Sequence, residues 1–102
     1  MKVHPITTEN FQKEVLLSRK PVLLDFYAPW CGPCNLLSPV LDEIAAQRPD
    51  LQVCKINVDT DHALSSHYKV FQLPTLLVIE EGVEKSRMVG ARPKEQILRL
   101  FA

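Results

Sequence analysis

The sequence predicts an α/β fold in which a mixed β-sheet of about five strands is flanked by helices on both faces. Apolar runs of strand length at 22–28 and 51–58 are each followed by a segment of helical character, an alternation typical of such layered folds. Two strand-like runs joined by a tight turn follow at 75–89, and a short helical segment closes the chain. No repeat or linker-like stretch interrupts these elements, and 102 residues suffice for one compact domain. Residues 1–102 are therefore expected to form a single domain.

The N-terminal elements are a short strand, a helix and a buried strand. The first strand begins near Val3, and Thr7 or Thr8 is expected to cap a helix that includes residues 11–16. Residues 22–28, VLLDFYA, are almost continuously apolar. Such a run suits a strand that is buried on both faces.

A longer helix is predicted after the CGPC sequence at 31–34. Its apolar residues recur at steps of three and four, the pattern of an amphipathic helix packed on a core. These residues are Leu36, Leu37, Val40, Leu41, Ile44 and Ala45. Pro39 lies inside the segment and is expected to kink the helix, because proline removes one amide and clashes with the preceding turn. The helix is expected to end at RPD, residues 48–50.

The middle of the chain contains a second buried strand and a short helix. Residues 51–58, LQVCKINV, form the strand, and Cys54 on its buried face is expected to be an inert thiol. Thr60 or Asp61 then opens a short helix over 60–68.

The C-terminal part of the chain predicts an antiparallel hairpin and a final helix. The hairpin consists of TLLVIE at 75–80, a turn at Glu81–Gly82 and VEKSRMV at 83–89. The helix spans 94–101, and its apolar face is formed by Ile97, Leu98 and Phe101. Strands joined through helices are expected to run parallel, and the hairpin adds an antiparallel edge.

Composition and charge argue against several classes of function. The 12 basic and 12 acidic residues give a net charge of zero, whereas a nucleic-acid-binding protein needs excess positive charge. The longest apolar runs are far too short to span a membrane, and no apolar stretch of a secretory signal follows Lys2. Three cysteines, an odd number, argue against a disulfide-stapled secreted protein. We therefore expect a cytoplasmic protein that binds neither nucleic acid nor membranes.

The segment that carries chemistry is CGPC, between the buried strand and the long helix. Cys31 ends the connecting loop and Cys34 lies in the first helical turn, where the helix dipole and unpaired amides favour a thiolate. Gly32 permits the tight geometry, and Pro33 suits a first turn because its missing amide is no loss there. Sulfurs three residues apart on one turn can close a disulfide. These features predict a nucleophile at Cys31 and a resolving thiol at Cys34.

Two other interpretations of the cysteine pair are a structural disulfide and a zinc site. A disulfide of this spacing closes a very small loop, so it would stabilise the fold little. A structural zinc site needs four ligands in most cases, and His62 and His67 have a suitable HxxxxH spacing. However, 27 residues separate Cys34 from His62, roughly double the interval of a zinc finger. CxxC beside a βαβ pattern therefore favours redox chemistry.

Several separated motifs, spread over nearly the whole chain, resemble those of the thioredoxin family. They are DFYAPWCGPC at 25–34, Pro39, KINVD at 55–59, LPT at 73–75 and VGA at 89–91. The resemblance implies the thioredoxin fold and a protein-disulfide reductase that works by dithiol–disulfide exchange. Pro33 within CGPC is similar to the reducing rather than the oxidising members of the family.

Asp25 and Lys55 each interrupt an apolar strand. From the local sequence alone, Asp25 is either buried with a raised pKa or faces solvent at a strand end. Lys55 could likewise sit where its strand reaches the surface. The resemblance implies that Asp25 is buried and exchanges a proton with the resolving Cys34, and that Lys55 lies near Asp25.

A docking surface around the cysteines is also implied. Trp30 precedes Cys31 in a loop, which favours an exposed indole over a core one. The resemblance implies a cis Leu73–Pro74 bond that faces the cysteines, with the Leu73 backbone pairing to an extended substrate segment. The rest of the surface is expected to be a flat apolar patch formed by Gly32, Pro33, Gly90 and Ala91.

The implied partners are disulfide-containing target proteins and a thioredoxin reductase, which draws on NADPH. The chain itself is expected to be a monomer with no metal and no bound cofactor. Two other functions stay open. A docking module with incidental turnover is opposed by the intact CGPC and Asp25, and an oxidant or isomerase outside the cytosol is opposed by the missing secretory signal.

The sequence departs from the family pattern at two single positions and at one pair of adjacent residues. Tyr27 stands where many thioredoxins have tryptophan, and Asn35 stands where lysine is common, which leaves less positive charge near the thiolate. Phe71-Gln72 replaces a pair that usually ends in glycine. Because Phe71-Gln72 lies in the docking loop, we expect it to affect substrate preference rather than the reaction.

Overall fold

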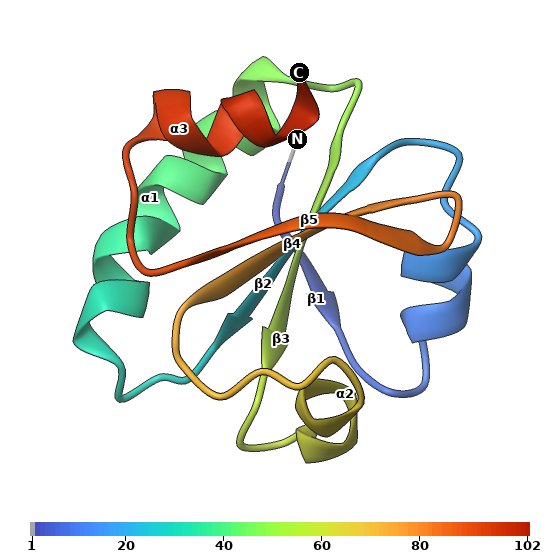
Figure 1. The fold of residues 1–102 in the computed structure, drawn as a ribbon, viewed down its shortest axis with the longest axis vertical. Helices are drawn as coiled ribbons and strands as arrows, with labels where there is room; N and C mark the ends of the chain where they lie inside the picture. Colours follow the sequence, from blue (N-terminus) through green and yellow to red (C-terminus); the bar gives the residue numbers. More distant parts are fainter. Residues whose placement is uncertain (1) are drawn as a thin grey trace.

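The computed structural model describes residues 2–102, and in this range it has five strands, three α-helices and two short helical turns. In chain order the elements are β1 (His4–Ile6), η1 (Gln12–Leu16), β2 (Val22–Tyr27), α1 (Gly32–Gln47), β3 (Gln52–Asn57), α2 (His62–His67), β4 (Thr75–Glu80), β5 (Val83–Val89), α3 (Lys94–Leu98) and η2 (Arg99–Phe101). Figure 1 shows α1 and α3 side by side, well away from η1 and α2. None of the helices within residues 2–102 has the length and apolar composition that crossing a bilayer requires.

The five strands form one mixed sheet in the order β1-β3-β2-β4-β5. β2 lies at the centre, where it pairs in parallel with β3 and antiparallel with β4. β1 is the parallel edge and β5 is the antiparallel edge. The predicted mixed sheet and its antiparallel hairpin are therefore confirmed.

Side chains alternate between the two faces of the central strand and build two apolar clusters. Val22, Leu24 and Phe26 point to the face that Phe11, Val15 and Leu64 cover. Leu23 points to the other face, where it packs with residues of α1 and α3. The members of this second cluster with less than 3 % exposure are Leu23, Leu37, Leu41, Ile44, Val53, Leu76, Val78 and Ile97. Helices on both faces of the sheet, as predicted, follow from this alternation.

The direction predicted for β4 is wrong. β4 runs antiparallel to β2, and β2 is parallel to β3, so β4 runs opposite to β3 although α2 joins them. A six-residue helix rises only about 9 Å, whereas a six-residue strand spans about 20 Å. α2 is therefore too short to return the chain to the edge from which β3 started. It lies beyond the end of β3, and β4 begins at that same edge (Figure 1).

The burial predicted for Leu36 is also wrong, since 75 % of this residue is exposed. The buried face of α1 is formed by Cys34, Leu37, Leu41, Ile44 and Ala45. At 100° per residue, Leu36 projects more than a quarter turn away from the centre of this face. The helix continues through Pro39 to Gln47, and the kink at Pro39 stays a prediction.

The first helix is shorter than predicted, and threonine does not cap it. η1 is a single π-helical turn with Phe11 at its N-cap and no capping side chain. The backbone amide of Thr8 instead donates to the Asp61 carboxylate over 3.1 Å. Thr60 or Asp61 was expected to open the helix α2, and Asp61 is its N-cap residue. The Asp61 side chain, however, makes no capping hydrogen bond to that helix. It connects the N-terminal segment to α2.

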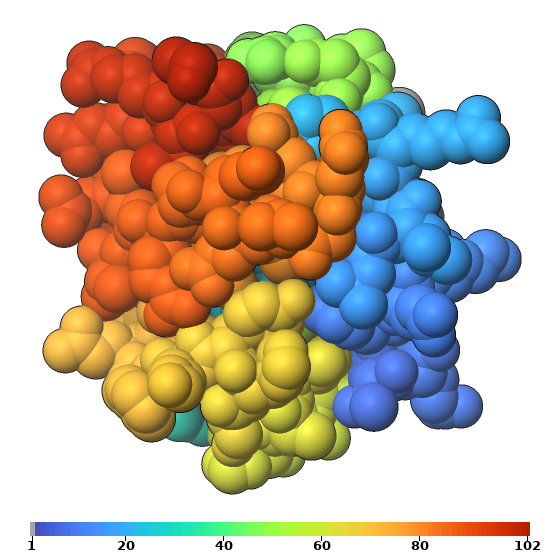
Figure 2. All heavy atoms as spheres, turned by 45° about the vertical axis from the view of Figure 1, so that its right-hand side comes forward, coloured from blue at the N-terminus to red at the C-terminus, as the bar shows by residue number. Residues whose placement is uncertain are grey.

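The hairpin matches the predicted residues at both strands and at the turn. Glu81 and Gly82 both have positive φ, 52° and 79°, as the tight hairpin turn of type I′ requires. In the space-filling view, the orange strand β5 lies directly above the yellow segment that carries α2 (Figure 2). The Arg87 guanidinium donates to the Tyr68 carbonyl over 2.8 Å and joins the two. The final helix is also close to its prediction, because η2 extends α3 to Phe101.

Burial of the central strand predicts where the fold is most sensitive to truncation. Phe26 is fully buried, so Phe26→Ala is expected to lower the free energy of unfolding by roughly 3–5 kcal/mol in urea denaturation of the oxidised protein. Phe71→Ala is the matched control, because Phe71 is 87 % exposed and its truncation should change this energy by less than about 0.5 kcal/mol. Equal losses for the two variants would contradict the burial pattern.

Candidate functional site

The two cysteines of CGPC lie at the N-terminus of α1 and are joined by a disulfide. Cys31 is the N-cap residue, and the backbone amide of Cys34 donates to its sulfur over 3.2 Å. Pro33 occupies the first turn, where no intrahelical amide is needed. The Cα atoms of the two cysteines are 5.3 Å apart, a separation ordinary for disulfides. Only 5 % of Cys31 and 3 % of Cys34 is exposed, so both cysteines are buried.

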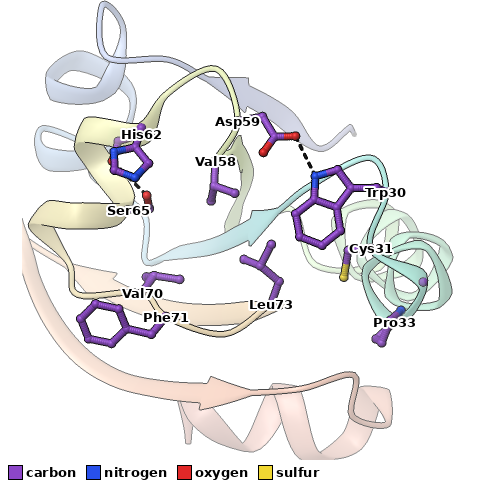
Figure 3. Close-up of a pocket in the computed structure, with 11 residues that line it drawn as sticks. Trp30, Cys31, Pro33, Val58, Asp59, His62, Ser65, Val70, Phe71 and Leu73 are labelled. Atoms are coloured by element: carbon purple, nitrogen blue, oxygen red, sulfur yellow. Dashed lines mark hydrogen bonds between the residues drawn. The ribbon is translucent and has the colours of Figure 1, made fainter.

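A cleft of about 540 Å³ begins at Cys31 and runs between α2 and the loop before β4. Its apolar lining is Trp30, Val58, Val70, Phe71 and Leu73, and its polar lining includes Asp59, His62 and Ser65. Figure 3 shows Trp30 and Cys31 at one end of the cleft, with His62 and Phe71 toward the other. A polypeptide segment that approaches Cys31 would meet these side chains first.

Trp30 is exposed, as its place in the loop predicted. The residue is 72 % exposed, and its indole N–H donates to the Asp59 carboxylate over 2.9 Å (Figure 3). This bond fixes the ring beside Cys31. Sequence reasoning assigned no role to Asp59, although Asp59 ends the KINVD motif.

The Leu73–Pro74 peptide bond is cis. Leu73 packs against the small buried cluster of Ala28, Cys31 and Cys34, so the loop before β4 adjoins the cysteine pair. The backbone amide of Gly90 donates to the Pro74 carbonyl over 2.8 Å. Gly90 has a φ of +96°, a conformation that glycine adopts without strain. Gly32, Pro33 and Ala91 are exposed in the same structure.

Asp25 lies inside the protein beneath the cysteine pair, which decides between the two interpretations of its sequence. It occupies the β2 position two residues after Leu23 and therefore points to the face that α1 covers. Only 4 % of the residue is exposed, and its Oδ1 has no hydrogen-bond partner among the described residues. Burial raises the pKa of Asp25 to about 7, although the positive charge of Lys55 opposes this shift.

A second cavity of about 350 Å³ adjoins Cys34 and shares no lining residue with the cleft. Asp25, Cys34 and Lys55 all line it, together with Asp42 and Ser38. Lys55 is the neighbour of Asp25 in the register of β2 and β3, so the expected proximity of the two residues is confirmed. A carboxyl group that titrates near neutral pH thus shares one cavity with the second cysteine.

The residues of the zinc alternative do not come together. Within residues 2–102, no three histidine, cysteine or acidic side chains form a group that could hold a metal ion. His67 stacks edge-on against Tyr68, whereas His62 lines the cleft. Cys54 is fully buried on β3, and burial raises the pKa of its thiol to about 12, in line with its predicted inertness.

Comparison with known proteins gives a consistent result. A family model described as Thioredoxin matches residues 2–102. Thioredoxin of Mycobacterium tuberculosis is 45% identical over 95 residues, which cover 92% of this chain and 82% of that protein. Thioredoxin 1 of Synechococcus elongatus is 46% identical over 90 residues, covering 87% of this chain and 84% of the relative. A bifunctional thioredoxin reductase/thioredoxin of Mycobacterium leprae is 44% identical over 95 residues, which cover 92% of this chain and 21% of that protein.

The raised pKa of Asp25 predicts a pH-dependent stability. Between about pH 4 and pH 7 the folded protein keeps a proton on Asp25 that the unfolded chain has lost, so the free energy of unfolding falls as pH rises. The loss reaches roughly 4 kcal/mol above pH 7. Asp25→Asn is expected to remove this slope in urea unfolding of the oxidised protein from pH 4 to pH 8.

The exposed Asp42 provides the control for this measurement, because it lines the same cavity from the solvent side of α1. Asp42→Asn should keep the slope of the unmodified protein. If Asp25→Asn and Asp42→Asn have the same pH profile, a buried and protonated Asp25 is contradicted.

Proposed function

This chain belongs to the thioredoxin family, a family of dithiol–disulfide oxidoreductases, and we propose that it reduces disulfides in target proteins through Cys31 and Cys34. The observation that carries the proposal is the Cys31–Cys34 disulfide at the N-terminus of α1, where Cys34 lines one cavity with the buried Asp25. Residues 1–102 act as one domain and as a monomer in the cytoplasm. No metal, bound cofactor, membrane or nucleic acid takes part.

The reaction begins with the reduced dithiol. The Cys31 thiolate attacks one sulfur of the target disulfide, the target S–S bond breaks, and a Cys31–target mixed disulfide forms. The second target sulfur leaves with the electron pair and takes up a proton. Cys34 then attacks the Cys31 sulfur and releases the first target sulfur. Two electrons have moved to the target, and the Cys31–Cys34 disulfide remains.

Two features of the site favour different roles for the two cysteines. The N-terminus of the 16-residue helix α1 offers its dipole and free amides to a thiolate at Cys31, which is the N-cap residue. Cys34 must lose its proton before it can attack, and Asp25 lines the same cavity with a pKa of about 7. A carboxylate with such a pKa can accept that proton near neutral pH. Lys55 acts on Asp25 as a neighbouring positive charge.

Target docking uses the surface around the cleft. Trp30, Gly32 and Pro33 flank Cys31 on one side, and the Leu73–Pro74 loop flanks it on the other. An extended target segment adds to the backbone of Leu73 as an extra strand, a common mode of peptide recognition. Gly90 and Ala91 complete the apolar rim beside Pro74.

The direction of electron flow follows from the charges around the nucleophile. Among the described residues that line the cleft, Asp59 is present but lysine and arginine are not. Cations stabilise a thiolate, and a strongly stabilised reduced form makes a dithiol oxidising. With little cationic stabilisation, and with Asn35 in place of lysine, the pair is a reductant.

A thioredoxin reductase returns the disulfide to the dithiol state with electrons from NADPH. The fusion of both activities in the name of the Mycobacterium leprae relative supports this pairing. The NADPH binds to the reductase and not to this chain.

Serine substitutions test the proposed roles. Cys31→Ser is expected to abolish turnover of a disulfide-bonded protein in the presence of a chemical dithiol, because the attacking sulfur is lost. Cys34→Ser should instead accumulate a mixed disulfide with the target, visible by mass spectrometry, since the resolving step is blocked.

Cys54→Ser is the matched control and should keep full turnover, because Cys54 is buried on the far side of the sheet from Asp25. Normal turnover by Cys31→Ser, or loss of turnover by Cys54→Ser alone, would contradict these roles.

A further inference from the structure

The loop between α2 and β4 presents an unusual apolar side chain at the end of the cleft. Phe71 is 87 % exposed, the highest exposure among the large apolar residues described. It lies between two hollows, because it lines both the Cys31 cleft and a second hollow of about 230 Å³. This second hollow is distinct from the cavity that Asp25 lines. Figure 3 shows its ring at the side of the cleft opposite Trp30 and Cys31.

The same loop presents a positive charge from a strained backbone position. Lys69 has a φ of +55°, a left-handed conformation that glycine adopts more readily than lysine. It is exposed and lines the second hollow together with Arg87. The Arg87 guanidinium donates to the Glu84 carboxylate over 2.7 and 2.9 Å, so the charge of Arg87 is compensated. Within residues 2–102, no carboxylate lies within ion-pair distance of Lys69.

Neither feature is explained by the stability of the fold. An exposed phenylalanine gains little from packing, and lysine in a left-handed conformation is less favourable than glycine. Phe71 nevertheless lines the cleft that leads to Cys31, and Lys69 lines the adjoining hollow that Phe71 shares. Residues that cost stability beside a reactive group point to a role in recognition.

We propose that Phe71 and Lys69 select the targets of this protein. The preferred target carries a bulky apolar side chain within about two residues of its disulfide cysteine, counted along an extended chain. An acidic residue is adjacent to that apolar residue. The apolar side chain packs on Phe71, and the carboxylate pairs with Lys69. This inference rests on the proposed function, since the target sulfur must first reach Cys31.

The geometry of the cleft supports this occupant. Cys31 and Phe71 line one cleft, so the segment that follows or precedes the target cysteine passes over Phe71. Val58, Val70 and Leu73 provide apolar surface that a large target side chain can cover, which removes both surfaces from water. The two ends of the docking surface differ in charge, with Asp59 beside Trp30 and Lys69 beyond Phe71. A target carboxylate is therefore favoured at the Phe71 end only.

The test is the reduction of synthetic peptide disulfides. Each peptide carries phenylalanine or alanine at one of the four positions within two residues of the target cysteine, and kcat/KM is measured for each. We expect the unmodified protein to prefer phenylalanine by about tenfold in at least one position. Phe71→Ala should reduce that preference to less than about twofold, and Phe71→Leu should restore part of it.

A matched control separates Phe71 from exposed apolar residues in general. Leu17 is 67 % exposed and follows η1, and Leu17→Ala should keep the full preference. If the unmodified protein shows no preference at any of the four positions, or if Phe71→Ala retains it, the role of Phe71 is overturned.

The charge component has its own test. In the preferred peptide, glutamate beside the phenylalanine should raise kcat/KM about threefold over glutamine at low salt. Lys69→Gln should remove this difference. The control is Lys20→Gln, which should keep it, because Lys20 is exposed and precedes the start of β2, whereas Cys31 follows the end of that strand. An equal effect of glutamate on the unmodified protein and Lys69→Gln would overturn the role of Lys69.

A small disulfide distinguishes failure of this inference from failure of the proposed function. Hydroxyethyl disulfide has no flanking side chains, so its reduction by the unmodified protein depends on the cysteine chemistry alone. Reduction of this compound without any peptide preference would overturn the selection by Phe71 and Lys69 only. Failure to reduce both this compound and every peptide disulfide would overturn the proposed function as well.

Discussion

The site depends on the packing of α1 against one face of the sheet. Leu37, Leu41 and Ile44 are fully or almost fully buried against strand residues such as Leu23 and Val78. This packing fixes the N-terminus of α1 at the carboxyl end of β2, where Cys31 caps the helix. The same packing holds Cys34 over Asp25, because Asp25 is on the face of β2 that α1 covers. The N-terminus of α1, the Cys31–Cys34 disulfide and the Asp25 carboxyl group therefore lie at one site.

If the stability of the fold alone determined the sequence, a buried carboxyl group would not be expected at position 25. Its burial raises the pKa to about 7, so an unfavourable free energy is retained where the carboxyl group meets the second cysteine. An apolar residue at this position would complete the core with Leu23 and Leu76. The carboxyl group instead lines one cavity with Lys55 and Cys34, as the proton transfer proposed between Asp25 and Cys34 requires.

Much of the fold and the chemical centre could be predicted from the sequence, because both rest on local patterns. The alternation of strand residues, the periodicity of helical residues and the CGPC motif can each be recognised within a short stretch of sequence. The bounds predicted for the two hairpin strands, 75–80 and 83–89, were correct. The direction of β4 depended on the length of α2, which had to be compared with the length of a strand. Leu36 matched the helical spacing but lies off the buried face. Asp59 contacts Trp30 through space across 29 positions, so no local pattern indicated the bond.

The most direct test of a reductant is the reduction potential of the Cys31–Cys34 pair, measured by equilibration with glutathione at pH 7. The weak cationic surroundings of Cys31 predict a potential more negative than about −230 mV, below the range of glutaredoxins. A potential less negative than about −180 mV, in the range of protein disulfide isomerase and stronger oxidants, would contradict a reducing role.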